Sequence, residues 1–184
     1  MIDRRKGETA MGDKTKKILP IILSIWPYLI VIPFLVAGRD GIATVVWWGY
    51  ALLTVVVYVA NIVNAFTYSG VNASYELAFW DMLIKLAHIL FYIAAFCMAL
   101  LMSLLTIALP GMIIFTPFIV LCFAAAEFVL MLTGSMYGVN ALVRASRQGM
   151  VSVSYAIGQG VMHFVFILDT ISAVLIFAKM KKVR

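Results

Sequence analysis

Five long apolar stretches, separated by short polar turns, dominate the pattern of hydrophobic and polar positions along the chain. A helix rises ~1.5 Å per residue, so about 20 apolar residues match a hydrocarbon core ~30 Å thick. The pattern therefore predicts an all-α, polytopic integral membrane helical bundle with about five transmembrane helices. The predicted spans are about 18–37, 42–66, 85–109, 112–134 (extending as helix to about 148) and 154–179.

The composition agrees with a chain whose main solvent is lipid. Of the 184 residues, 65% are hydrophobic and 12% are charged, and the mean hydropathy is +1.07. Soluble domains are typically ~45–50% apolar and ~25% charged, so a soluble core of this size could not bury so much apolar surface. We expect one transmembrane domain over 18–179, between basic tails at 1–17 and 180–184, with the lipid bilayer as its main partner.

The net charge of +6 does not indicate nucleic-acid binding, because the Lys and Arg residues cluster at the chain ends and beside the apolar stretches. The first 17 residues carry six of them, and we expect this tail on the cytoplasmic side of a bacterial plasma membrane. Met1 and Met11 are both candidate starts. A signal peptide is a rival interpretation, but 18–37 is longer than the usual ~7–15-residue apolar segment and lacks an A-x-A cleavage pattern.

The number of crossings depends on the first stretch, which carries Pro20, Pro27 and Pro33. Each proline removes a backbone donor, so we expect this helix to be bent or partly re-entrant. Five crossings with a cytoplasmic N-terminus place nine Lys and Arg residues inside and five outside; four crossings with a re-entrant first stretch give eleven and three. The charge rule favours four. The 20 uninterrupted uncharged residues favour five, which we predict, with four as the alternative.

Two other segments have distinctive patterns. Residues 67–84 include Glu76 and Asp81, and they predict an interfacial loop followed by a short amphipathic helix. Gly134 and Gly138 form a small-xxx-small pair that lets another helix approach closely, with helix packing at no special site as the simpler interpretation.

Polar side chains fall at overlapping depths in several predicted spans. Glu127 is the only charged residue in the fourth, where an ionisable group costs on the order of 2.5–3.5 kcal/mol and is usually turned inward and partnered. We predict a polar pocket open to the cytoplasm, with Glu127 and His163 as its central pair. The other expected members are His88, Asn61, Asn64 and Gln159. Asp169 lies six residues after His163, on a different face of a continuous helix, and is assigned to a second polar site.

Such a pocket favours a small transport-type or channel-type protein that binds a proton, a cation or a small polar solute. Interhelical hydrogen bonds alone are the structural alternative. A homo-oligomer or a membrane partner subunit is expected, because five short-looped helices enclose little cavity. A non-transporting regulator, immunity protein or assembly partner is the second functional hypothesis. A membrane-embedded lipid enzyme is the third, although the sequence has no phosphate loop, GxSxG or HExxH motif.

We predict neither a cofactor nor a resident metal ion. His88, Glu127 and His163 are ligand types, but they come from three spans without local ligand spacing, which makes a metal site the weaker variant. Cys97 and Cys122 lie inside apolar stretches without CxxC spacing, and we interpret them as small buried apolar side chains.

Overall fold

The computed structural model describes residues 16–36, 41–109, 111 and 113–183, and this part of the chain is helical without a strand. The all-α prediction is therefore confirmed. Most of the basic N-terminal tail (1–15) and Arg184 lie outside the described residues. After a helix over 16–25 the elements are η1 (Trp26–Ile30), α2 (Val31–Leu35), α3 (Ile42–Thr67), α4 (Ala73–Ala108), η2 (Ile113–Phe115), α5 (Thr116–Arg147), α6 (Val153–Met162) and α7 (Phe166–Val183).

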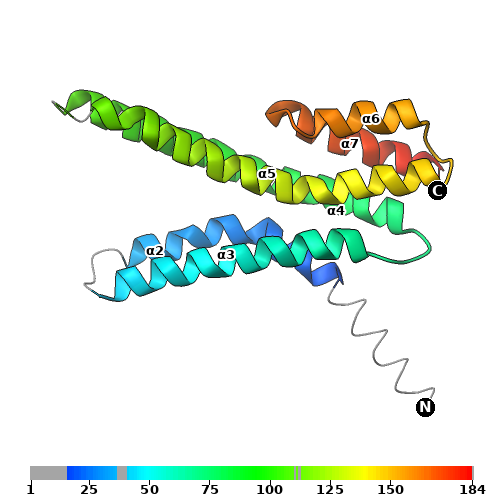
Figure 1. Cartoon of the computed structure of the whole chain (residues 1–184), viewed down its shortest axis with the longest axis horizontal. Coiled ribbons are helices and arrows are strands. Elements are labelled where there is room, and N and C mark those ends of the chain that lie inside the picture. The colour runs from blue at the N-terminus through cyan, green and yellow to red at the C-terminus, as the bar shows by residue number, and fades with distance from the viewer. Residues whose placement is uncertain (1–15, 37–40, 110, 112, 184) are drawn as a thin grey trace, which may run out of the picture.

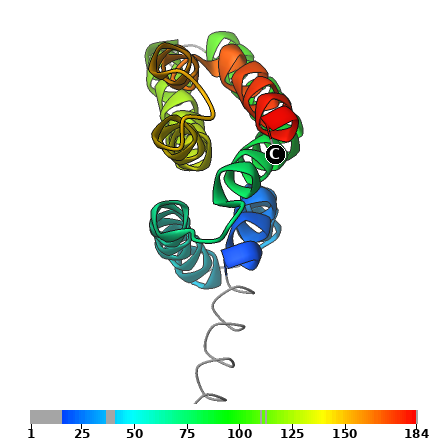
Figure 2. The ribbon, with the colours of Figure 1, turned by 90° about the vertical axis from the view of Figure 1, so that its right-hand side faces the viewer.

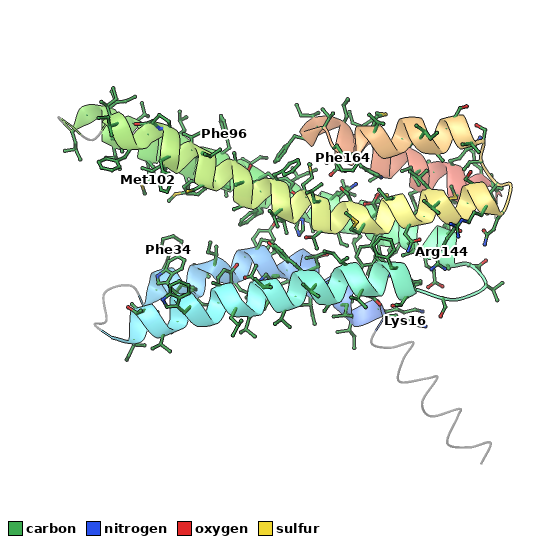
Figure 3. All side chains as sticks on the ribbon, in the orientation of Figure 1. Lys16, Phe34, Phe96, Met102, Arg144 and Phe164 are labelled. Carbon is green, nitrogen blue, oxygen red and sulfur yellow. The ribbon has the colours of Figure 1, made fainter. Side chains whose placement is uncertain are left out.

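The helices form three antiparallel pairs, with α4 and α5 in the middle (Figure 1). The first span and α3 lie on one side of this central pair. On the other side α6 lies along α5, and α7 lies along α4 (Figure 2). Lys16 and Arg144 lie at one end of the bundle, whereas Phe34 and Met102 lie toward the opposite end (Figure 3). The buried apolar core includes Ala65, Leu77, Tyr137, Ala141 and Ile176, where the three pairs meet.

Four helices in the described part are long and apolar enough to cross a membrane: Lys16–Leu35, Ile42–Thr67, Ala73–Ala108 and Ile113–Arg147. The predicted fifth span over 154–179 is not one continuous helix, because the helix ends at Met162 and a new one begins at Phe166. With 10 residues α6 is too short to cross, and α7 carries an aspartate and three lysines in 18 residues. The first stretch, which the alternative treats as re-entrant, is one of the four helices that are long and apolar enough to cross.

The outward surface of the spans is apolar, as a lipid-facing surface requires. Along α3 the exposed side chains include Val45, Trp48 and Leu52. Cys97 on α4 and Cys122 on α5 are also exposed, so the prediction that both thiols are buried is wrong. Lipid can cover exposed positions on these two long helices, and Cys122 also borders an apolar cavity between α5 and the N-terminal hairpin.

The interfacial segment predicted over 67–84 is mostly part of a long helix. α4 begins at Ala73 and continues unbroken to Ala108, so only the first residues form a loop. The Tyr68 hydroxyl donates a hydrogen bond of 2.5 Å to Glu76 Oε2 in the first turn of α4. Burial raises the pKa of Tyr68, and its hydrogen bond to the Glu76 carboxylate raises it further. The loop is thereby tied to the start of α4.

Candidate functional site

A buried ionic cluster begins on α4, where Asp81 and Lys85 are four residues apart. Residues at this spacing lie on one face of a helix, one above the other. Lys85 Nζ is 2.9 Å from Asp81 Oδ1, and the side chains are 2% and 0% exposed. Long apolar stretches of α4 and α5 surround this pair, and two charges in such surroundings are costly unless partners compensate them.

The partners come from the break between α6 and α7. Because the helix ends at Met162, the chain turns at His163 and restarts at Phe166. This turn brings His163 Nδ1 to 2.8 Å from Asp169 Oδ1, although the two residues would lie on different faces of a continuous helix. The prediction that they belong to separate sites is therefore wrong. They form the second half of what we call the ionic cluster: Asp81, Lys85, His163 and Asp169.

Three atoms of the ionic cluster form a tight triangle. Lys85 Nζ is 2.5 Å from Asp169 Oδ1 and 2.7 Å from His163 Nδ1. Ser135 of α5 donates a further hydrogen bond of 3.0 Å to Asp169 Oδ1. The four ionisable side chains of the cluster are each at most 2% exposed. Helices α4, α5 and α7 and the α6–α7 turn thus meet at one polar point.

Three buried atoms of the cluster have no hydrogen bond within the described residues, and of these Asp81 Oδ1 has a close ion pair with Lys85. Asp81 Oδ2 and His163 Nε2 have no hydrogen-bond partner in the described structure, although they are only 3.6 Å apart. Gly138 of α5 packs against both, and a Cβ built there would lie 2.4 Å from each atom. Gly134, one turn earlier, packs against Ile84. The predicted close helix approach at the two glycines is confirmed, and Gly138 faces the ionic cluster.

Glu127, the predicted centre of the pocket, is not part of this cluster. No hydrogen bond or ion pair links it to another side chain in the described part of the chain, and the predicted Glu127–His163 pair is wrong. The reason is distance along α5. Gly138 contacts His163, and it is three turns away from Glu127, about 16 Å at the helical rise. Because α6 ends at Met162, the turn does not reach Glu127.

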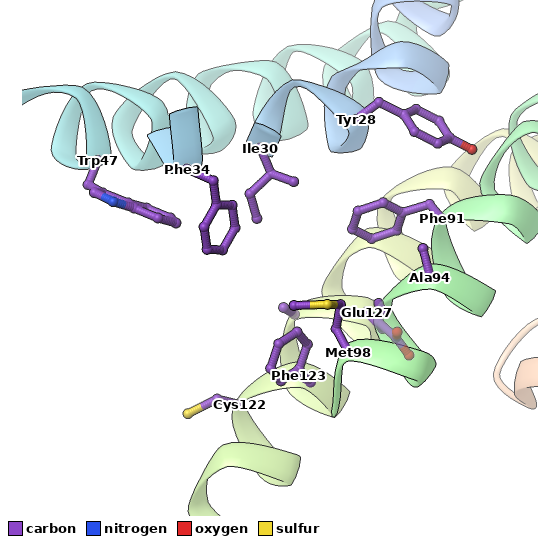
Figure 4. Close-up of a pocket in the computed structure, with 12 residues that line it drawn as sticks. Tyr28, Ile30, Phe34, Trp47, Phe91, Ala94, Met98, Cys122, Phe123 and Glu127 are labelled. Atoms are coloured by element: carbon purple, nitrogen blue, oxygen red, sulfur yellow. The ribbon is translucent and has the colours of Figure 1, made fainter. Parts of the chain in front are cut away.

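Glu127 instead lies on the wall of an apolar wedge between the N-terminal hairpin and α4–α5 (Figure 4). The cavity has a volume of about 460 Å³. Phe34 and Trp47 lie on one side, and Phe91 and Phe123 on the other (Figure 4). Aromatic and aliphatic side chains make up most of this lining, so the wedge is a lipid-like environment rather than the polar pocket that we predicted.

Asn61 and Asn64 form a separate polar group with α5. The Tyr137 hydroxyl donates to Asn61 Oδ1 at 2.8 Å and accepts from Asn64 Nδ2 at 2.9 Å. Asn140 donates to the carbonyl of Ala65 at the end of α3. These bonds satisfy polar groups between two spans, as interhelical hydrogen bonds do in membranes. The two asparagines therefore fit the alternative of interhelical hydrogen bonding, and they are not part of a pocket with Glu127.

His88 also has a structural partner. Its Nε2 donates to the carbonyl of Leu23 at 3.0 Å. In a regular helix that carbonyl would accept from residue 27, but Pro27 has no N–H. The carbonyl of Lys16 would likewise accept from residue 20, which is Pro20. Asn64 Nδ2 donates to this carbonyl at 3.0 Å instead. Neighbouring helices thus satisfy carbonyls that two prolines of the predicted bent span leave free.

Replacing His88 with alanine is expected to lower the free energy of unfolding by about 1–3 kcal/mol, because the buried Leu23 carbonyl loses its donor. His88→Gln keeps a side-chain N–H donor and should lose less. Equilibrium unfolding in mixed detergent micelles measures both. Equal losses for the two variants would show that the hydrogen bond is not what His88 contributes.

Gln159 takes part in the hairpin rather than in a pocket. Ser172 of α7 donates to the Gln159 side-chain oxygen at 2.7 Å and to its backbone carbonyl at 3.1 Å. These bonds join α6 to α7 just beyond the ionic cluster. The residues predicted for one pocket therefore lie in separate places. Asn61 and Asn64 meet at Tyr137, whereas His163 meets Asp169, which was predicted for a second site.

The whole ionic cluster lies within the part of the chain that resembles other sequences. A family model described as a family of unknown function, DUF6652, matches residues 40–182. The chain belongs to this family. The DUF6652 match runs from just before α3 to the last residues of α7, so it contains all four ionisable residues of the cluster. Comparisons with curated proteins and with solved structures found no match.

Sequence reasoning missed Asp81 and Lys85 as members of the site. The signal was present: an acid and a base four residues apart at the entrance to an apolar span form a pair on one helix face. From the sequence, Lys85 is predicted at the start of its span and Asp81 in the interfacial segment before it. The break that joins His163 to Asp169 has no proline to mark it, and only the three-dimensional packing reveals it.

Proposed function

We propose that this DUF6652 member is a transport-type membrane protein that moves protons, and that the ionic cluster binds the exchangeable proton. One observation carries the proposal. His163 Nδ1 lies within hydrogen-bond distance of a donor and of an acceptor at once, 2.7 Å from Lys85 Nζ and 2.8 Å from Asp169 Oδ1. A ring nitrogen has one in-plane hydrogen-bond position, so it serves only one of these partners at a time.

The two choices correspond to two protonation states. In the neutral ring with its proton on Nε2, Nδ1 accepts a hydrogen bond from the Lys85 ammonium. When Nδ1 takes up a proton from water, it becomes a donor, and its acceptor is Asp169 Oδ1. One proton therefore changes the partner of the imidazole without displacing any heavy atom over a long distance. Imidazole is the side chain whose ordinary titration lies nearest to neutral pH.

The charges of the cluster favour this uptake. With both carboxylates ionised, Asp81 and Asp169 supply two negative charges and Lys85 one positive charge, so with neutral His163 the cluster carries a net charge of −1. A proton on the imidazole brings that sum to zero. An uncompensated charge in a low-dielectric interior is costly, and protonation of the His163 imidazole removes this net negative charge.

The packing favours a proton over a larger cation or a solute. The 3.6 Å between Asp81 Oδ2 and His163 Nε2 leaves no room for another heavy atom between them, and Gly138 closes one side. A proton needs no such space. The Ser135 hydroxyl on α5 donates to Asp169 Oδ1, which contacts the ring, and His88 and Tyr92 lie about one and two turns beyond Lys85 on α4.

Proton movement through purified protein tests the proposal. Liposomes with a trapped pH-sensitive dye and an inside-negative potassium diffusion potential should acidify several-fold faster with the protein than without it. His163→Asn should lose this flux, whereas His88→Gln, outside the cluster, should keep it. Gel filtration confirms that both variants remain folded. A parent protein no faster than protein-free liposomes, or a His163→Asn variant as fast as the parent, would refute the proposal.

The seal around the cluster favours a second candidate, a non-transporting membrane protein. Each ionisable member is at most 2% exposed, so a proton enters only if α6 and α7 move. In a regulator or assembly partner the same contacts would simply hold the hairpin in place. This candidate predicts no proton flux from the parent, together with a stable stoichiometric partner after mild detergent extraction.

A further inference from the structure

The α6–α7 pair reaches deep along the spans without crossing to the far end. Phe166, the first residue of α7, contacts Tyr92 of α4 with ring centroids 4.9 Å apart and the ring planes tilted by 59°. Phe177, near the other end of α7, contacts Tyr75 at 5.5 Å in the first turn of α4. The turn between α6 and α7 therefore lies more than four helical turns along α4 from its N-terminal end.

The depth of the α6–α7 turn can be compared with positions along the first span. His88, one turn before Tyr92 on α4, is hydrogen-bonded to Leu23 of the span Lys16–Leu35. Tyr28 of the same span donates to the carbonyl of Ala87. Leu23 and Tyr28 lie in the middle of that span. The α6–α7 turn thus lies level with the middle of a helix that is long enough to cross the bilayer.

The surface of the hairpin changes character along its length. Around the turn the exposed side chains are apolar, with exposed fractions of 55% for Phe164, 48% for Val165 and 77% for Ile167. The polar groups of the turn, His163 and Asp169, face the protein and are at most 2% exposed. The last turns of α7 instead carry lysines, at 179, 181 and 182.

The basic residues gather at one end of the bundle. Lys16 and Lys17 begin the first span, Arg144 and Arg147 end α5, and the α7 lysines lie at the same end (Figures 1 and 3). Of the 14 Lys and Arg residues, Lys85 is buried in the ionic cluster and Arg39 belongs to the sequence that joins the first span to α3 at the opposite end. The other twelve flank helix ends on one side or adjoin them in sequence.

We propose that α6 and α7 form a re-entrant hairpin, which enters the bilayer from the cytoplasmic side with its apolar turn in lipid hydrocarbon and returns to the same side. The occupant of the exposed apolar turn is thus the lipid itself, and the lysines of α7 face the anionic cytoplasmic leaflet. This inference does not depend on proton movement.

The backbone of the turn fits such a position. Irregular backbone is tolerated at membrane depth only where its polar groups are satisfied. Here the N–H groups of His163, Phe164 and Val165 donate to the carbonyls three residues before them, at 3.3, 3.1 and 3.2 Å. Asp169 N donates at 2.8 Å to the carbonyl of Val165. Four N–H groups of the turn are therefore satisfied by carbonyls of the same segment, and its charged side chains are directed into the bundle.

Cysteine labelling from one side of the membrane tests the path of the chain. In a variant with Cys97 and Cys122 replaced by alanine, single cysteines are introduced by Val71→Cys, Val183→Cys and Leu109→Cys, at exposed positions. A membrane-impermeant maleimide on intact cells should label Leu109→Cys and spare the other two; inverted vesicles should give the reverse. Labelling of Val183→Cys together with Leu109→Cys would mean a full fifth crossing and would overturn the proposal.

A second measurement tests whether the turn is in lipid. A spin label at Phe164→Cys should be accessible to oxygen and protected from a water-soluble nickel complex, to the same degree as a label at the lipid-facing Leu90→Cys on α4. Accessibility to the nickel complex would place the hairpin outside the membrane. Protection from both reagents would mean that a second protein copy or a partner covers the turn. Either result would overturn the proposal.

Discussion

Replacing Lys85 with methionine is expected to lower the free energy of unfolding by about 3–5 kcal/mol, the cost of removing one partner from a buried ion pair. Lys85 is the only cation of fixed charge in the cluster, 2.9 Å from Asp81 and 2.5 Å from Asp169. Methionine has a similar length but no charge, and it leaves the two carboxylates with only the His163 imidazole to compensate them. Equilibrium unfolding in mixed micelles measures the loss.

Two control variants separate the loss of the buried counter-ion from the loss of any lysine or any member of the cluster. Lys17→Met removes an exposed lysine at the beginning of the first span and should change the free energy of unfolding by about 0.5 kcal/mol or less. Asp81→Asn leaves the Lys85–Asp169 pair with balanced charges, so it should cost clearly less than Lys85→Met. A Lys85→Met variant as stable as Lys17→Met would contradict the assignment of Lys85 as the counter-ion of the cluster.

Replacing Gly138 with alanine is expected to cost about 1–3 kcal/mol, since the new methyl group overfills a packed interface. Its Cβ would lie 2.4 Å from Asp81 Oδ2 and from His163 Nε2, and neither atom can move without breaking the ionic cluster. Gly134→Ala is the matched control on the same helix. Its Cβ meets only the Ile84 Cγ2 methyl, at 3.2 Å, and alanine is the better helix former.

The comparison of these two variants separates the cluster from general helix packing. We expect Gly134→Ala to stay within about 1 kcal/mol of the parent protein, because an end methyl of a side chain can shift by a few tenths of an ångström. We also expect Gly138→Ala to lose proton flux while Gly134→Ala keeps it. Equal effects on stability and flux would mean that α5 approaches its neighbours loosely at both glycines.

Long helices such as α3 and α5 could be predicted from the sequence because a long apolar stretch is a strong local signal. The stretches 42–66 and 112–148 became α3 and α5 within a few residues. The bent first span followed from its prolines, and Gly134 with Gly138 marked the close approach of helices. These features depend on residues near one another in the chain, or on the absence of charge over a long run.

The cluster itself could not be predicted in the same way. Its formation depends on the end of α6 at Met162, where the sequence contains no proline, and on the packing of α7 along α4. A continuous helix over 154–179 separates His163 from Asp169 and directs His163 toward the depth of Glu127. The two errors about His163, its pairing with Glu127 and its separation from Asp169, thus come from one undetected helix break.

The protonation of His163 can be observed directly and tests the central claim. The chain has two histidines, so His88→Gln leaves His163 as the only one. In lipid nanodiscs, ¹⁵N-histidine NMR should show a neutral ring with its proton on Nε2 at alkaline pH, where Nδ1 accepts from Lys85, and a doubly protonated ring at acidic pH. The change should be reversible while the protein stays folded. A ring that keeps one tautomer and one charge throughout that range would contradict the claim that the ionic cluster carries an exchangeable proton.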